Sequence, residues 1–128
     1  MSSLFALRLF GYRLLKPLNW PVSRAVAIPR PTLFVGPDAS LRLCASIGLF
    51  GYRRVMIVTD AVLVKLGLVE PLRQALLAQG IDVAVHDGIT PDPTYPVLQA
   101  GYEAIRAHHS DAILAIGGGS AIDAAKVI

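Results

Sequence analysis

Three consecutive glycines followed by a serine form the part of this sequence best suited to binding chemistry. The run Gly117–Ser120 directly follows an apolar stretch, and a helical pattern begins at about Ala121. Glycines let the backbone come close to a ligand, and the free amides at a helix start attract anions because the helix dipole is positive there. Ser120 adds a hydroxyl donor. The run therefore predicts a binding site for a phosphate or a diphosphate.

The same residues also allow a structural interpretation. Ser120 and Asp123 have the spacing of a capping box, with the glycines forming a tight turn. Capping alone does not require three successive glycines, each of which costs about 0.5–1 kcal/mol relative to alanine when ordered. The two roles are compatible, and the glycines favour ligand binding. The run is neither of the two commonest phosphate loops, because Ile122 replaces a third spaced glycine and no Gly-Lys-Ser or Gly-Lys-Thr follows.

The elements that position this run alternate between strands and helices. Short apolar or β-branched runs predict strands at 32–35, 55–59, 81–85 and 112–116. Helical spacing predicts helices at 38–49, 63–78, 95–109 and from 121. Asp38 or Ser40 is expected to cap the first helix, and Gly67 and Pro71 mark a break in the second. Because this alternation builds βαβ units, we predict an α/β fold with a Rossmann-like parallel sheet and flanking helices.

Prolines separate this pattern from the beginning of the chain. We expect residues 1–30 to form an amphipathic helix and a proline-rich arm, and residues 31–128 to form a truncated dinucleotide-binding domain. The last predicted helix has about two turns and no capping residue before Ile128, which is typical of a fragment. The apolar face of the N-terminal helix suits docking on an absent domain, and weak contact with a membrane surface is the alternative.

Charge and cysteine content exclude other classes of function. Five basic residues precede the first acid, Asp38, whereas the remainder carries seven basic and nine acidic side chains. A nucleic-acid surface needs its basic stripe on the folded body, so we expect no nucleic-acid partner. Cys44 is the single cysteine, which rules out an internal disulfide and fits a reducing cytoplasm. We expect it to be a small buried core residue.

The wider pattern resembles one family. The run from Gly117 to Lys126 is similar to the nucleotide-binding motif of the iron-containing (group III) alcohol dehydrogenases, relatives of glycerol dehydrogenase and dehydroquinate synthase. The resemblance extends upstream through Val58-Thr59-Asp60 and Pro91-Asp92-Pro93-Thr94, and it covers about residues 31–128.

The resemblance implies roles in binding NAD(P). In that family the glycine run holds the diphosphate, which places cofactor contacts at Gly118, Gly119, Ser120 and Asp123. Asp60 stands where the family has an acid that contacts the adenosine ribose.

A carboxylate at Asp60 hydrogen-bonds a free 2′-hydroxyl and repels a 2′-phosphate, so NAD is favoured over NADP. A helix cap or a solvated turn residue is its alternative role. Asp92 stands where the family often has asparagine, near the adenine end of the cofactor, and a plain turn residue is an equal alternative. Aspartate keeps the acceptor but lacks the amide donor.

The catalytic metal and the substrate site are expected outside this chain. The resemblance implies Fe²⁺ or Zn²⁺ held by one aspartate and three histidines in a helical second domain beyond residue 128. His108 and His109 diverge by about 100° on a helix and cannot chelate as an i, i+4 pair would. We therefore assign no metal ligand and no catalytic residue to this chain.

The resemblance further implies an oxidoreductase that transfers hydride between an alcohol or aldehyde and NAD. The full-length enzyme is expected to form homo-oligomers. The alternatives are a nonenzymatic nucleotide-binding fragment and an NAD-dependent synthase of the dehydroquinate synthase type. Ser120 and Ala125-Lys126 favour the dehydrogenase branch.

Overall fold

The computed structural model describes residues 31–128, and residues 34–128 form one compact unit. The helix and arm expected within residues 1–30 lie outside this range, so the division of the chain near residue 30 stays a prediction. Within the described range, no helix is both long enough and apolar enough to cross a membrane.

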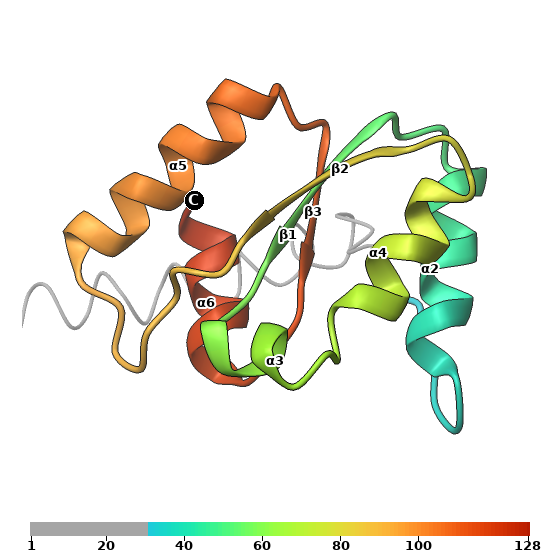
Figure 1. The fold of residues 1–128 in the computed structure, drawn as a ribbon, viewed down its shortest axis with the longest axis horizontal. Helices are drawn as coiled ribbons and strands as arrows, with labels where there is room; N and C mark the ends of the chain where they lie inside the picture. The colour runs from blue at the N-terminus through green and yellow to red at the C-terminus, as the bar shows by residue number, and fades with distance from the viewer. Residues whose placement is uncertain (1–30) are drawn as a thin grey trace, which may run out of the picture. The chain divides into compact units, whose positions relative to one another are not determined.

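Three parallel strands form the sheet, in the order β2-β1-β3 (Figure 1). They are β1 (Arg54–Val58), β2 (Asp82–His86) and β3 (Ala112–Ala115). All of β1 after Arg54 is buried, as a continuous apolar run in a sheet covered on both faces should be. The predicted α/β class with a parallel sheet is confirmed.

Alternate side chains of β1 build two separate cores. Val55 and Ile57 face α2 (Ala39–Leu49) and α4 (Glu70–Leu77), whereas Met56 and Val58 face α5 (Tyr95–His108) and α6 (Gly119–Val127). Figure 1 shows these two pairs of helices on opposite sides of the strands. Cys44 of α2 is fully buried in the first core, as predicted, and burial raises the pKa of its thiol.

The strand predicted at 32–35 is wrong. The structure assigns residues 31–35 to no strand, and Leu33 and Val35 are 84% and 73% exposed. A β-prone run becomes a strand only when another strand accepts its hydrogen bonds, and the sheet of the described chain offers it none. The carbonyl of Val35 instead accepts a hydrogen bond from Arg42 Nη2 at 2.7 Å.

The prediction that a side chain caps α2 is also wrong. Asp38 is the N-cap residue, but its φ of 55° is left-handed and its side chain makes no capping bond, while Ser40 lies inside the helix. A capping side chain needs an extended backbone to reach the first amides, which a left-handed residue does not provide.

The break predicted in the second helical region is confirmed. The region divides into α3 (Ala61–Lys65) and α4, with Gly67 at a φ of +72° between them. Pro71 lies in the first turn of α4, where its missing N–H costs nothing. Pro71 is therefore compatible with the start of α4 and does not interrupt that helix.

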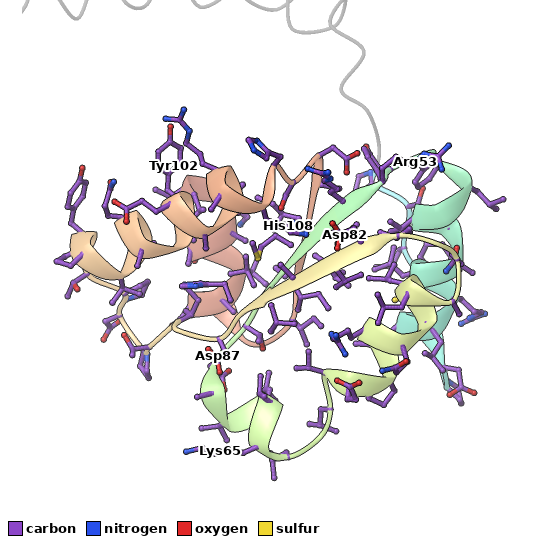
Figure 2. All side chains as sticks on the ribbon, turned by 45° about the horizontal axis from the view of Figure 1, so that its top comes forward. Arg53, Lys65, Asp82, Asp87, Tyr102 and His108 are labelled. Carbon is purple, nitrogen blue, oxygen red and sulfur yellow. The ribbon has the colours of Figure 1, made fainter. Side chains whose placement is uncertain are left out.

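One carboxylate ties the amino ends of two strands together. Asp111, directly before β3, accepts hydrogen bonds from the backbone N–H of Arg53 at 2.8 Å and of Arg54 at 3.0 Å. These bonds lower the pKa of Asp111 from its ordinary value. Nearby, His108 Nε2 lies 3.5 Å from Asp82 Oδ2 (Figure 2).

We expect Asp111→Ala to destabilise the protein at neutral pH and much less in acid. Because folding lowers the pKa of Asp111, its contribution is complete above the unfolded-state pKa of about 3.9 and is lost as pH falls through the lower folded-state pKa. Urea midpoints of both proteins between neutral pH and strong acid measure this. The exposed Asp87, changed to alanine, is the control and should have little effect. A gap between wild type and Asp111→Ala that does not narrow in acid would contradict the prediction.

Candidate functional site

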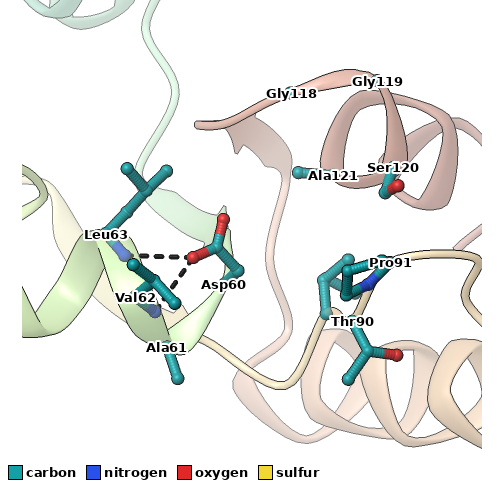
Figure 3. A pocket seen from close by; sticks show the side chains of 11 residues that line it. Asp60, Ala61, Val62, Leu63, Thr90, Pro91, Gly118, Gly119, Ser120 and Ala121 are labelled. Atoms are coloured by element: carbon teal, nitrogen blue, oxygen red, sulfur yellow. Dashed lines mark hydrogen bonds between the residues drawn. The ribbon is translucent and has the colours of Figure 1, made fainter.

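A pocket of about 510 Å³ lies at the carboxyl edge of the sheet (Figure 3). Three loops build it, one after each strand, with the lining residues Asp60–Leu63, Ile89–Pro91 and Gly118–Ala121. The carboxyl edge is where open parallel sheets bind ligands, because the loops and helix starts converge there.

Backbone contacts hold two of these loops together. The amide of Ile89 donates to the carbonyl of Thr59 at 3.2 Å, and Asp60 and Gly88 form an isolated bridge. The end of β1 and the loop after β2 therefore form one wall of the pocket.

The space around the backbone differs among the three glycines. Gly117 has a φ of +145°, and a Cβ there would lie 2.9 Å from the Cβ of Ala121, so the fold itself requires glycine. At Gly118 and Gly119 a Cβ would meet nothing within 4 Å. Packing within the described chain therefore does not require glycine at Gly118 or Gly119, and their backbone is open to close approach by a ligand.

The start of α6 is open toward this pocket. Gly118 is the N-cap residue and provides no side-chain cap for the amides of the first turn. The capping-box interpretation is wrong because α6 begins at Gly119, about two residues earlier than expected, so Ser120 lies in the first turn. Asp123 binds Lys126 Nζ at 2.9 Å instead. The first-turn amides are therefore available to an anion.

The two carboxylate oxygens of Asp60 have different surroundings. Its Oδ1 caps α3, accepting from the amides of Val62 at 2.9 Å and Leu63 at 3.0 Å (Figure 3). The alternative role of Asp60 as a helix cap is thus present in the structure. Its Oδ2 takes no part in this cap and lies on the side of the glycine run, 3.6 Å from where a Cβ of Gly117 would be. One carboxylate can therefore hold α3 and still accept a hydrogen bond from a ligand.

The structure brings together four of the six predicted cofactor residues. Asp60, Gly118, Gly119 and Ser120 line the pocket, whereas Asp92 and Asp123 are exposed and do not. The φ of Asp92 is +51°, a left-handed conformation that asparagine, aspartate and glycine tolerate best. The left-handed turn therefore accounts for aspartate at this position whether or not Asp92 contacts a ligand.

The apolar part of the lining was not predicted. Ala61, Val62, Leu63, Ile89 and Ala121 all contribute to it. In the sequence such residues at element ends cannot be distinguished from core residues. The feature of the sequence that could have identified them as pocket residues is their position close along the chain to Asp60 and to the glycine run.

The described residues do not suit a catalytic metal. Between residues 31 and 128 no group of three or more histidine, cysteine, aspartate or glutamate side chains is placed to hold one.

The fold and the pocket define an α/β protein with a candidate anion-binding site at the carboxyl edge of a parallel sheet, and comparison with known proteins identifies its family. The model of the family described as iron-containing alcohol dehydrogenase matches residues 30–128, so this chain belongs to that family.

Several curated proteins are similar to the chain. Alcohol dehydrogenase 4 of Schizosaccharomyces pombe is 37% identical over 108 residues, covering 84% of this chain and 25% of that protein. Lactaldehyde reductase of Escherichia coli is 35% identical over 97 residues, covering 76% and 25%. The NAD-dependent methanol dehydrogenase of Bacillus methanolicus is 33% identical over 98 residues, covering 77% and 26%. The chain thus spans about a quarter of the length of these relatives.

Solved structures agree with this assignment. A 1,3-propanediol oxidoreductase matches with a TM-score of 0.68 and 34% identity, covering 73% of this chain and 24% of the other. The NADH-dependent butanol dehydrogenase A of Thermotoga maritima matches with a TM-score of 0.69 and 25% identity, covering 78% and 26%.

Proposed function

We propose that this chain binds NAD at the carboxyl edge of its sheet and is the cofactor-binding part of an NAD-dependent alcohol dehydrogenase. One observation supports this most strongly. The open backbone of Gly118 and Gly119, at the start of α6, shares a single pocket with Asp60. Backbone amides that can donate to an anion and a carboxylate that can accept from a hydroxyl lie in one pocket. They match the diphosphate and the ribose of a dinucleotide.

The diphosphate is proposed to lie against the first turn of α6. The amides of Gly119 and Ser120 and the hydroxyl of Ser120 are its donors, and Asp123 follows one turn later. Asp60 is the single charged residue among those that line the pocket. Backbone amides and the helix dipole therefore compensate the phosphate charge, without a basic side chain in the lining.

NAD is proposed as the cofactor in preference to NADP. The Oδ2 atom of Asp60 is available to accept from a ribose 2′-hydroxyl, and its negative charge repels a phosphate there. Asp92 is proposed to contribute at the adenine end. Two similar proteins carry dependence on NAD or NADH in their names, the methanol dehydrogenase and butanol dehydrogenase A.

The proposed reaction of the longer enzyme is hydride transfer between a small alcohol or aldehyde and NAD. NAD supplies the redox chemistry when bound, while the residues of this chain bind and orient it. The names of the similar proteins, which include a lactaldehyde reductase and a 1,3-propanediol dehydrogenase, favour a dehydrogenase over a synthase.

Other features of the longer enzyme also remain proposals. A metal, iron by the family description and zinc as the alternative, is proposed to be bound outside the described residues. A homo-oligomeric enzyme in the cytoplasm is proposed as well. If the protein is instead a nonenzymatic binding fragment, NAD binds equally well but no alcohol is oxidised.

Two substitutions at Asp60 test the cofactor preference. Asp60→Asn keeps an oxygen that can cap α3 but removes the charge, so we expect unchanged thermal stability and a loss of about tenfold in the preference for NAD over NADP. Asp60→Ala also removes the cap, which costs about 0.5–2 kcal/mol, so stability falls as well. Calorimetric titration with each nucleotide and thermal unfolding provide the measurements.

The proposal has two points at which it can fail. If folded wild-type protein binds neither nucleotide, the described site is insufficient for binding. If it binds NAD and Asp60→Asn leaves the preference unchanged, the site stands but Asp60 does not discriminate between the nucleotides.

A further inference from the structure

Asp87 and Gly88 form the single aspartate–glycine pair of the sequence. The pair connects the end of β2 to the loop that lines the proposed nucleotide pocket, and both residues are exposed (Figure 2). A glycine after an aspartate leaves its amide open to the aspartate carboxyl group, because glycine has no side chain to hinder the approach. The chemistry that this pair allows is a rearrangement of its own backbone.

Both reacting groups of the pair are free of hydrogen bonds within the described chain. The carboxylate of Asp87 makes no hydrogen bond or ion pair between residues 31 and 128, and the amide of Gly88 donates to no acceptor there. The next amide, that of Ile89, donates to the carbonyl of Thr59 at 3.2 Å. No hydrogen bond of the described chain therefore has to break before the Gly88 amide reaches the Asp87 carboxyl group.

The two nearest aspartates lack this combination. Asp82 precedes Val83, whose β-branched side chain hinders the approach of its amide. Asp92 precedes Pro93, which has no amide hydrogen to lose. The other aspartates each precede alanine, and they are Asp38, Asp60, Asp111 and Asp123. We therefore expect the rearrangement to be fastest at Asp87.

The fold itself keeps glycine at position 88. A Cβ there would lie 3.1 Å from Cε1 and 3.2 Å from Nε2 of His86. The same imidazole ring has little room to move away, because its Nε2 lies 3.3 Å from where a Cβ of Gly101 on α5 would be. A side chain at position 88 would disturb this packing, so the reactive pair is a consequence of the fold.

We propose that Asp87 is a modification site at which aspartate converts spontaneously to isoaspartate. The Gly88 nitrogen attacks Cγ of the protonated Asp87 carboxyl group, and the new N–Cγ bond closes a succinimide ring. The hydroxyl of the carboxyl group leaves with the amide proton as water. A second water then attacks the main-chain carbonyl carbon of Asp87 and breaks its bond to the Gly88 nitrogen, so that the backbone runs through Cγ. Attack of that water at Cγ restores aspartate instead, and no oxidant or reductant takes part.

The modification lengthens the main chain at the wall of the pocket. Isoaspartate adds one carbon to the backbone before Gly88, which is about 1.5 Å of chain. Gly88 forms the bridge with Asp60, and Ile89 is 4% exposed and bound to Thr59. The added carbon must displace one of these contacts. We expect the modified protein to be less stable and to bind NAD more weakly, and this second effect rests on the proposed function.

Ageing of the whole chain in warm, mildly acidic buffer tests the site, because the protonated carboxyl group is the form that loses water. Trypsin releases residues 74–106 as one peptide, which contains Asp82, Asp87 and Asp92. A protease that cleaves before aspartate does not cleave before isoaspartate. We expect cleavage before Asp87 to be lost about tenfold faster than cleavage before Asp82 or Asp92, which are internal controls.

Asp87→Glu is the matched control variant. It keeps the charge, but attack by the Gly88 amide would have to close a larger ring, which is slower. Methyl transfer by an isoaspartyl methyltransferase measures the isoaspartate content of both proteins, and ageing should raise it in wild type and much less in Asp87→Glu. Equal methylation of the two aged proteins overturns the proposal. Cleavage before Asp87 that persists as long as cleavage before Asp82 overturns it too.

The consequences are measured on modified and unmodified protein separated by ion exchange. We expect the modified fraction to have a lower urea midpoint and about tenfold weaker NAD binding. Equal urea midpoints of the two fractions overturn the proposed displacement of the pocket wall. Fresh protein that binds no NAD, but accumulates isoaspartate at position 87, contradicts the proposed function and supports this modification site.

Discussion

Replacing Gly117 with alanine is expected to reduce NAD affinity at least tenfold and to lower the melting temperature of the protein. The φ of Gly117 is +145°, and the new Cβ would lie 2.9 Å from the Cβ of Ala121 and 3.6 Å from Asp60 Oδ2. A non-glycine residue in such a conformation costs about 1–3 kcal/mol, and each kcal/mol lowers the melting temperature of a domain of this size by roughly 4–8 °C. To relieve the clash, Ala121 and the first turn of α6 must shift relative to residue 117, which changes the shape of the pocket that Gly118–Ala121 line.

Gly119→Val is the matched comparison, because it separates binding from folding. Nothing lies within 4 Å of a Cβ at Gly119, and valine is a better helix residue than glycine. We therefore expect unchanged or slightly higher stability together with loss of NAD binding, since Gly119 lines the pocket and valine would block close approach of the diphosphate to its backbone. Thermal unfolding and calorimetric titration of the two variants measure both effects. Retained NAD affinity in Gly119→Val would exclude the glycine run from the binding site.

Leu76→Ala is expected to be the most destabilising of the substitutions considered. Leu76 is fully buried in α4, in the core that also contains Cys44 and Ile57. Truncating a buried leucine removes apolar contacts and leaves a cavity, which costs about 2–5 kcal/mol. Domains are typically stable by about 5–15 kcal/mol, so the variant approaches unfolding at room temperature.

Urea unfolding with a constant slope measures this loss of stability. Leu66→Ala is the control, since Leu66 is 65% exposed and its truncation should change stability by about 0.5 kcal/mol or less. Equal effects of the two substitutions would show that α4 does not form part of the stabilising core.

The sequence by itself determined the α/β class, the three strands of the sheet and the glycine run. These features depend on local properties, since hydrophobic spacing and glycine between strand and helix can be identified in a short window. The buried run of β1 and the break at Gly67 are examples. Residues 32–35 show the limit of this reasoning, because a strand also needs a neighbour to accept its hydrogen bonds.

Only the tertiary structure decided how the site is assembled. Asp60 and Gly117 are far apart in the sequence, and parallel pairing of β1 with β3 brings them to the same edge. The exact start of α6 and the left-handed turn at Asp92 were also not predicted from the sequence. Local patterns specify elements, whereas pockets and edges arise from long-range packing of segments, which a local sequence pattern does not encode.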